Sequence, residues 1–234
     1  MEFYLARAIA LDVDNARVMS DAALVIIARA PEMGRGKSRL AADIGPAGAL
    51  DVTRQLLARL AVTQAAWNGP VLLCSSGDDA GWAQTGLAHL PRQKQPDGDL
   101  GMKIAAALQW GLAHAPRAIA IGTDCPALRP QHVRELVASL AQAPVAFGPA
   151  RDGGYWGIAV ADPQVIPLVT GADLPWSTPH LLGETVRRLV ASGVISARGP
   201  LLADCDTLTN LREAVLAGLL TWPRDALCGP DKAG

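Results

Sequence analysis

Residues 24–40 read LVIIARAPEMGRGKSRL, an apolar run followed by a turn rich in glycine and basic side chains. The run Leu24–Ala28 is short, continuous and rich in branched residues, so it predicts a strand buried on both faces of a sheet. Glycines and cations directly after such a strand place backbone amides and positive charge at its carboxyl end. That edge is where the sheets of α/β proteins bind their ligands.

Apolar runs and amphipathic stretches alternate along the rest of the chain. Further buried strands are predicted at Val71–Cys74, Ala118–Ile121, Val145–Phe147 and Trp156–Val160. Helices are predicted at Ala47–Ala66, Leu100–Ala115, Pro130–Ala141, Thr178–Ala191 (with Thr178 as N-cap and Pro179 as first helical residue) and Thr207–Leu220. This order predicts an α/β, Rossmann-like fold, with a mainly parallel sheet and helices on both faces. We expect one domain over residues 23–227, after an N-terminal extension (1–22) and before a C-terminal tail (228–234).

The composition argues against several classes of function. The net charge is −1, so the chain lacks the basic surplus of proteins that bind nucleic acid or anionic membranes. No apolar run reaches the roughly 18 residues that span a bilayer. The four cysteines form no CxxC pair, which argues against a zinc or redox motif and favours a reduced, cytoplasmic chain. No feature of the sequence indicates an oligomeric state.

The basic turn carries Arg29, Arg35, Lys37 and Arg39 at one strand end. Mobile cations beside backbone amides are what a di- or triphosphate requires. Gly36, Lys37 and Ser38 also suggest a P-loop, but the Walker pattern needs glycine at position 31 and this chain has proline there. A solvated basic turn is the alternative to phosphate binding.

Acidic residues follow two other segments. Asp124 comes directly after the run Ala118–Ile121, where a hard carboxylate suits Mg²⁺ or Mn²⁺ on substrate phosphates; it could instead cap the following turn. Asp204 and Asp206 alternate along an extended segment and would point the same way, with a cation between them. Asp206 could instead be the N-cap of the last helix.

Two glycine-containing segments have two readings each. Asp99, flanked by Gly98 and Gly101, begins either an ordinary capped helix or a loop that faces a ligand. The stretch Asp152–Tyr155 contains two glycines beside an acid and an aromatic residue. It could shape a pocket for a sugar or another small acceptor, or form a hairpin turn.

Six motifs in order carry a resemblance: Arg-Ala-Pro-x-x-Gly-x-x-Lys-Ser-Arg-Leu, Gly-Asp-Leu-Gly, Gly-Thr-Asp-Cys-Pro, Gly-Pro-x-x-Asp-Gly-Gly-Tyr, Pro-Trp-Ser-Thr and Asp-x-Asp-Thr. Over residues 23–216 the chain resembles the bacterial DUF2064 family of type-A-fold glycosyltransferases. That family is similar to phospholactate guanylyltransferases and molybdenum-cofactor nucleotidyltransferases. The resemblance implies the nucleotide-diphospho-sugar transferase (GT-A) type of the fold.

The resemblance also implies roles for individual residues. The donor nucleotide would be held by Arg29, Gly34, Lys37, Arg39, Gly98, Asp99, Leu100 and Gly101. Asp124 would bind the metal, with Asp206 and Asp204 completing its shell. The acceptor would contact Asp152, Gly153, Gly154, Tyr155 and Trp176. Two positions depart from the pattern: Gly36 stands where a bulkier residue is expected, and Trp156 where another aromatic or aliphatic residue is expected.

The expected chemistry is neutralisation of a leaving pyrophosphate by Lys37, Arg39 and the Asp124-bound metal. We expect glycosyl transfer from a nucleotide-activated sugar to a small-molecule acceptor. Nucleotidyl transfer from a nucleoside triphosphate to a phosphorylated acceptor is the alternative, favoured by the charge of the basic turn. A regulator that binds a nucleotide without turnover is a third hypothesis.

Overall fold

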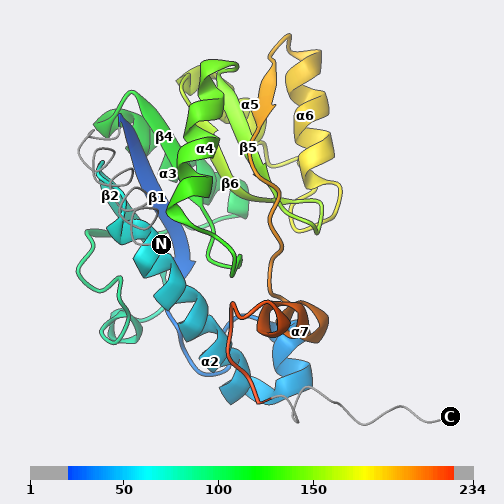
Figure 1. The fold of residues 1–234 in the computed structure, drawn as a ribbon. Helices are drawn as coiled ribbons and strands as arrows, with labels where there is room; N and C mark the ends of the chain where they lie inside the picture. Colours follow the sequence, from blue (N-terminus) through cyan, green and yellow to red (C-terminus); the bar gives the residue numbers. More distant parts are fainter. Residues whose placement is uncertain (1–20, 224–234) are drawn as a thin grey trace, which may run out of the picture.

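The computed structural model describes residues 21–223 (Figure 1). The strands are β1 (Ala22–Arg29), β2 (Val71–Ser76), β3 (Arg92–Lys94), β4 (Arg117–Ile121), β5 (Val145–Pro149), β6 (Tyr155–Val160) and β7 (Ser196–Arg198). The α-helices are α2 (Ser38–Ala65), α3 (Leu100–His114), α4 (Pro130–Ala138), α5 (Ile166–Val169), α6 (Leu181–Ala191) and α7 (Leu208–Leu216). Short 3₁₀ turns are η1 (Asp79–Trp82), η2 (Ser139–Ala141) and η3 (Pro163–Val165). The tail at 228–234 and all but the last two residues of the extension at 1–22 lie outside the described residues.

The strands form one seven-stranded sheet in the order β3-β2-β1-β4-β6-β5-β7. All neighbouring pairs are parallel except those of β6, which runs antiparallel to both β4 and β5. The predicted Rossmann-like, mainly parallel sheet is thus confirmed. The carboxyl ends of β1, β2 and β4 lie at the same edge as the beginning of β6, so residues from both directions meet there.

Helices cover both faces of the sheet, and alternate residues of the inner strand β1 show how. Leu24 and Ile26 of β1 pack with Leu57 of α2 and Leu136 of α4 on one face. Val25 lies in the cluster on the other face, which holds side chains of α3, α5 and α6. Each such side chain removed from water contributes about 1.5–3 kcal/mol, so these two layers supply most of the stability.

A third cluster joins the end of the chain to its beginning. Leu211 of α7 packs with Leu40 and Leu56 of α2, and with the buried Cys205. Figure 1 shows α7 beside the first half of α2, below the sheet edge. This contact fixes the segment before α7, which includes Asp206, next to the basic turn.

Two predicted helix starts need correction, and two strands were not predicted. α2 begins at Ser38 rather than at 47, because the chain continues through a kink at Gly45 (φ 77°) and Pro46. α6 begins at Leu181 with His180 as N-cap, because Thr178 accepts from the His180 amide in a turn that precedes the helix. β3 and β7 have three residues each and no buried residue, so they lack the apolar signal that marks the other strands.

Among residues 21–223, no helix combines the length and apolar character needed to cross a bilayer.

Candidate functional site

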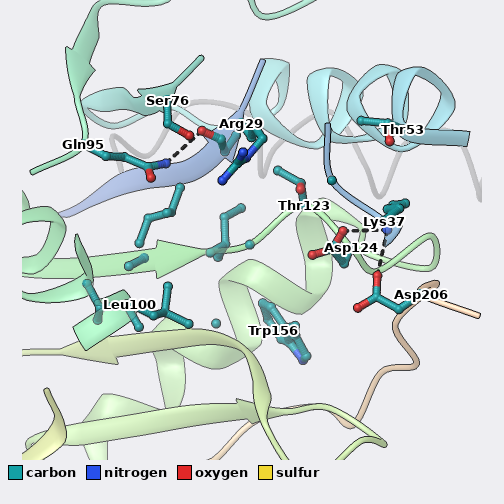
Figure 2. Close-up of a pocket in the computed structure, with 18 of the residues that line it drawn as sticks. Arg29, Lys37, Thr53, Ser76, Gln95, Leu100, Thr123, Asp124, Trp156 and Asp206 are labelled. Carbon is teal, nitrogen blue, oxygen red and sulfur yellow. Dashed lines mark hydrogen bonds and ion pairs between the residues drawn. The ribbon is translucent and has the colours of Figure 1, made fainter. Parts of the chain in front are cut away.

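A cavity of about 490 Å³ opens at the shared edge of β1, β4 and β6 (Figure 2). Ser76, Gln95 and Leu100 lie at one end of the view, and Lys37, Asp124 and Asp206 at the other. The residues predicted from sequence that line it are Arg29, Lys37, Arg39, Leu100, Asp124, Tyr155 and Asp206, and Arg35 lines it with them. Side chains from six segments that are distant in the sequence therefore meet around one space.

Lys37 is held by three oxygens. Its Nζ donates to Asp124 Oδ1 at 2.7 Å, to the Cys205 carbonyl at 2.8 Å and to Asp206 Oδ1 at 3.0 Å. The lysine side chain is only 7% exposed, while those of Asp124 and Asp206 are 51% and 43% exposed. The two carboxylates are thus bridged on their inner side and open to the cavity on their outer side.

The backbone of the basic turn directs Lys37 inward. Gly34, Gly36 and Lys37 all have positive φ, with Lys37 at φ 45° and ψ 44° directly before α2. Glycine adopts this region freely, but for a lysine it costs about 1–2 kcal/mol. Such a conformation persists when surrounding contacts fix it, and here the three bonds of the ammonium do so.

Asp206 reaches Lys37 because another residue caps the last helix. Thr207 is the N-cap of α7, its Oγ1 accepts from the Asn210 amide, and Asn210 Oδ1 accepts back from the Thr207 amide. The alternative of Asp206 as N-cap is therefore wrong. The Cys205 amide also donates to the Asp124 carbonyl at 2.9 Å, which ties the segment before α7 to the loop after β4.

The charges of the cluster keep Lys37 protonated. Burial lowers its pKa, but the attraction of Asp124 and Asp206 and their hydrogen bonds more than offset this, so its pKa is raised overall. Asp204 differs from its neighbour Asp206. Burial is the largest cause that raises the pKa of Asp204, with contributions from Asp152, Asp206 and Asp124. Asp204 does not line the cavity or contact Lys37.

The arginines of the basic turn differ from Lys37 in exposure and in hydrogen bonding. Arg29, Arg35 and Arg39 are exposed and line the cavity. Within residues 21–223 their guanidinium groups have neither an ion pair nor a side-chain hydrogen bond. No other described residue accepts from the side-chain N–H donors of these arginines, and the geometry of those donors matches that of phosphate oxygens.

Sequence reasoning missed Gln95, which follows β3 and is buried. Its Nε2 donates to the carbonyls of Ala28 at 2.8 Å and Cys74 at 3.0 Å. Because both amide hydrogens are used, the orientation of the amide is fixed and Oε1 remains as an acceptor at the cavity. β3 is too short and polar to be recognised as a strand, so the residue that follows it was not among the predicted site residues.

Other predicted residues have local structural contacts. Asp99 accepts from the Met102 amide as N-cap of α3. Gly101 lies so close to Trp176 that an added Cβ would be 2.8 Å from its ring. Gly34, Gly98, Asp99, Gly101 and Trp176 do not line the cavity, while Leu100 does. Their contact with a nucleotide or acceptor stays a prediction.

The stretch before β6 forms the hairpin turn that was the alternative reading. Asp152 Oδ1 accepts from the Gly154 amide, and Gly153 has φ 90° and lies against the Pro179 carbonyl. Asp152, Gly153 and Gly154 do not line the cavity, whereas Tyr155 and Trp156 do. Their role in binding an acceptor is untested by this geometry.

The carboxylate oxygens at the cavity are suitable ligands for a magnesium or manganese ion. Across the described part of the chain, no three His, Cys, Asp or Glu side chains gather closely enough to hold an ion alone. Asp124 and Asp206, however, are partly exposed, and their side-chain hydrogen bonds to other described residues use only Oδ1. Mg²⁺ in proteins is typically bound by one or two carboxylates together with substrate phosphates, which matches this pair.

Comparison with known proteins gives a family and a fold. The family model "Uncharacterized protein conserved in bacteria (DUF2064)" matches residues 59–178, about half of the chain. No functionally curated protein matches the sequence.

Several solved structures are similar. A candidate nucleotide-diphospho-sugar transferase from Desulfovibrio desulfuricans G20 aligns with a TM-score of 0.72 and 24% identity, over 82% of this chain and 85% of that one. The inositol-1-phosphate CTP transferase of T. maritima aligns at 0.54 and 13% identity, over 84% and 94%. The 4-diphosphocytidyl-2C-methyl-D-erythritol synthase of Anaerococcus prevotii aligns at 0.52 and 10% identity, over 85% and 98%. At these identities the likeness shows the shared fold, of the type predicted from the sequence motifs.

Proposed function

This chain belongs to the DUF2064 family of bacterial proteins, and we propose that it is a nucleotide-dependent transferase. Its best-supported reaction is nucleotidyl transfer from a nucleoside triphosphate to a small acceptor. One observation carries this proposal: three arginines that have no ion pair within residues 21–223 face the same cavity as a carboxylate pair, at the ligand-binding edge of the sheet. The sequence alone favoured glycosyl transfer, and the state of the arginines reverses that preference.

Charge supports a triphosphate as the donor. Lys37 neutralises one of the two carboxylates it bridges, so that cluster retains a single negative charge. Arg29, Arg35 and Arg39 outweigh it and give the lining of the cavity a net positive charge. A divalent cation on the carboxylates would increase this surplus. A donor with three phosphates uses such a surplus more fully than a nucleoside diphosphate sugar, whose two phosphates carry less charge.

The end of the cavity formed by the uncharged side chains of Gln95 and Leu100, here called the neutral end, suits the nucleoside. Gln95 Oε1 is held as an acceptor for an N–H group on the edge of a base. Leu100, which is 40% exposed, offers an apolar surface near it. Both residues come from the carboxyl side of β3 and the start of α3, so they are rigidly placed relative to β1.

In the proposed reaction a phosphate oxygen of the acceptor, which carries no proton, attacks the α-phosphorus of the donor. The new P–O bond forms as the bond to the β-phosphate oxygen breaks, and pyrophosphate leaves with the electron pair. The arginines neutralise the charge that develops on the leaving group. When bound by Asp124 and Asp206, a divalent cation would act as a Lewis acid on the phosphate oxygens.

Glycosyl transfer is kept as a second candidate because of the residues on β6. Tyr155 and Trp156 line the cavity, and aromatic surfaces are suited to the faces of a sugar ring. In that reaction a nucleoside diphosphate leaves rather than pyrophosphate. The two reactions therefore differ in a product that can be measured directly.

The test begins with a thermal-shift screen of nucleoside triphosphates and nucleotide sugars, with Mg²⁺ or Mn²⁺. Stabilising donors are then incubated with pools of small phosphorylated and hydroxyl acceptors, and pyrophosphate and nucleoside diphosphate are assayed separately. We expect pyrophosphate release that depends on the acceptor. Release of nucleoside diphosphate from a nucleotide sugar would establish the second candidate, and binding without any turnover would identify a regulator instead.

A further inference from the structure

Lys37 differs from the arginines at the cavity because all of its N–H donors are already used in hydrogen bonds. An ammonium group has three N–H donors, and all three are used by Asp124 Oδ1, Asp206 Oδ1 and the Cys205 carbonyl. To contact a phosphate, the side chain would have to abandon at least one of these bonds. The neighbouring arginines of the same turn make no such side-chain bonds within residues 21–223.

The partners of Lys37 need a cation between them. Asp124 follows β4 and Asp206 precedes α7, and their Oδ1 atoms both lie within 3.0 Å of one nitrogen. Two carboxylates that close repel each other unless a positive charge separates them. The buried ammonium is the cation that the chain itself supplies there.

We propose that Lys37 is a positioning residue: its ammonium bridges the inner oxygens of Asp124 and Asp206 and so presents their outer oxygens to a divalent cation, while the arginines alone hold the phosphates. The part of this inference that concerns phosphate binding by the arginines rests on the proposed function. It assigns two roles to one short turn. Lys37 organises the carboxylates, and Arg29, Arg35 and Arg39 face the ligand.

The left-handed backbone at Lys37 supports this division. Gly34 and Gly36 have open space around them, so their positive φ angles serve the path of the chain rather than close packing. That path turns the side chain of Lys37 toward the sheet edge, where it is 7% exposed, whereas Arg35 and Arg39 on either side remain exposed. A turn built only to bind phosphate would not need its lysine buried.

The first experiment compares Lys37→Met with the wild-type protein by thermal unfolding, with EDTA and with Mn²⁺. Methionine keeps the length of the side chain and removes the charge. We expect a lower melting temperature in EDTA, and a larger rise on adding Mn²⁺ than the wild type shows, because the metal then supplies the missing bridge. Arg35→Met is the matched control, and its response to Mn²⁺ should equal that of the wild type.

A double variant keeps the test valid if Lys37→Met alone does not fold. Asp206→Asn leaves one carboxylate beside the lysine, so removing the lysine charge in that background should lower the melting temperature less than in the wild type. Folding of the double variant where the single variant fails would support the bridge. Equal losses in both backgrounds would show that Lys37 does not act through the carboxylate pair.

The second experiment measures binding of inorganic triphosphate in EDTA by calorimetry. We expect Lys37→Met to bind within about threefold of the wild type and Arg39→Met to lose about tenfold or more, as for a charge-assisted contact. A tenfold loss for Lys37→Met, together with an unchanged Mn²⁺ response, would overturn the proposal. If the wild type binds no triphosphate, the proposed function fails, and the melting comparison still decides the role of Lys37.

Discussion

The two ends of the cavity are built in different ways. At the neutral end, Gln95 is fixed by hydrogen bonds to β1 and β2, so its position follows from the register of three adjacent strands. At the charged end, Lys37 and Asp206 are 169 residues apart and meet because α7 packs on α2 and the Cys205 amide bonds to the Asp124 carbonyl. The first end is a property of the sheet, and the second depends on a contact outside it. Substitutions should therefore affect the two ends differently.

The largest expected effect is at the charged end. Asp124→Asn removes a carboxylate that holds Lys37 and faces the proposed metal. We expect turnover to fall by roughly 10²–10³-fold, as when one electrostatic contact to a transition state is lost. EDTA should reduce the wild type to a similar level and change the variant little. Initial rates of pyrophosphate release measure this, with circular dichroism as a check of folding. Unchanged activity would refute the metal assignment.

A second substitution separates the phosphates from the nucleoside. Arg39→Met should weaken binding of nucleoside triphosphate by about ten- to hundredfold, because charge-assisted hydrogen bonds contribute roughly 1.5–3 kcal/mol. Binding of the unphosphorylated nucleoside should stay the same. Calorimetric titration with both ligands makes the comparison. Arg198→Met, in β7 at the far edge of the sheet, is a control that should change neither affinity. Equal losses for both ligands would place Arg39 away from the phosphates.

The neutral end should respond in selectivity and in stability. Gln95→Leu removes the two hydrogen bonds from Nε2 to the carbonyls of Ala28 and Cys74, each of which contributes roughly 0.5–1.5 kcal/mol to the unfolding free energy. It also removes the acceptor for the base, so affinities for triphosphates with different bases should become more alike. Urea unfolding and a four-nucleotide binding series measure the two effects. A variant that keeps wild-type base preference would show that Gln95 serves the sheet alone.

The smallest effect concerns the cysteines around the charged end. Burial is the main cause that raises the pKa of Cys125, and it raises the pKa of Cys205 to about 11. Because the thiolate is the reactive form, both thiols should be almost unreactive toward iodoacetamide at pH 8 in the folded protein and react once it is unfolded. Peptide mass spectrometry resolves each site. Rapid labelling of Cys205 in the native protein would mean that the segment before α7 opens readily.

Much of the fold could be predicted because its central strands carry the signal themselves. Leu24–Ala28 and Ala118–Ile121 are apolar without interruption, as strands buried on both faces must be, and both lie in the sheet. The edge strand β3 consists of Arg92, Gln93 and Lys94, all exposed, and its identity comes only from pairing with β2. A local sequence pattern cannot predict a strand that forms only because it pairs with a neighbouring strand.

The site was predictable to a similar degree. The placement of cations after β1 and of Asp124 after β4 followed from topology, because the carboxyl ends of parallel strands share an edge. Alternation suggested that Asp204 and Asp206 point the same way, but the segment is not a regular strand and only Asp206 bonds to Lys37. The inward turn of Lys37 depends on the positive φ angles of Gly34, Gly36 and Lys37. Glycine permits such angles, but its presence in a sequence does not predict them.

The docking of α7 on α2 has a consequence for how the protein is made. Translation adds roughly 5–20 residues per second, so Asp206 leaves the ribosome roughly ten to thirty seconds after Lys37. Throughout that interval the nascent chain has its arginine-rich turn but not the second carboxylate or the Cys205 carbonyl. A growing chain thus presents its basic turn before the cluster of Lys37 and the two carboxylates can form, and the order is imposed by the sequence positions of the two partners.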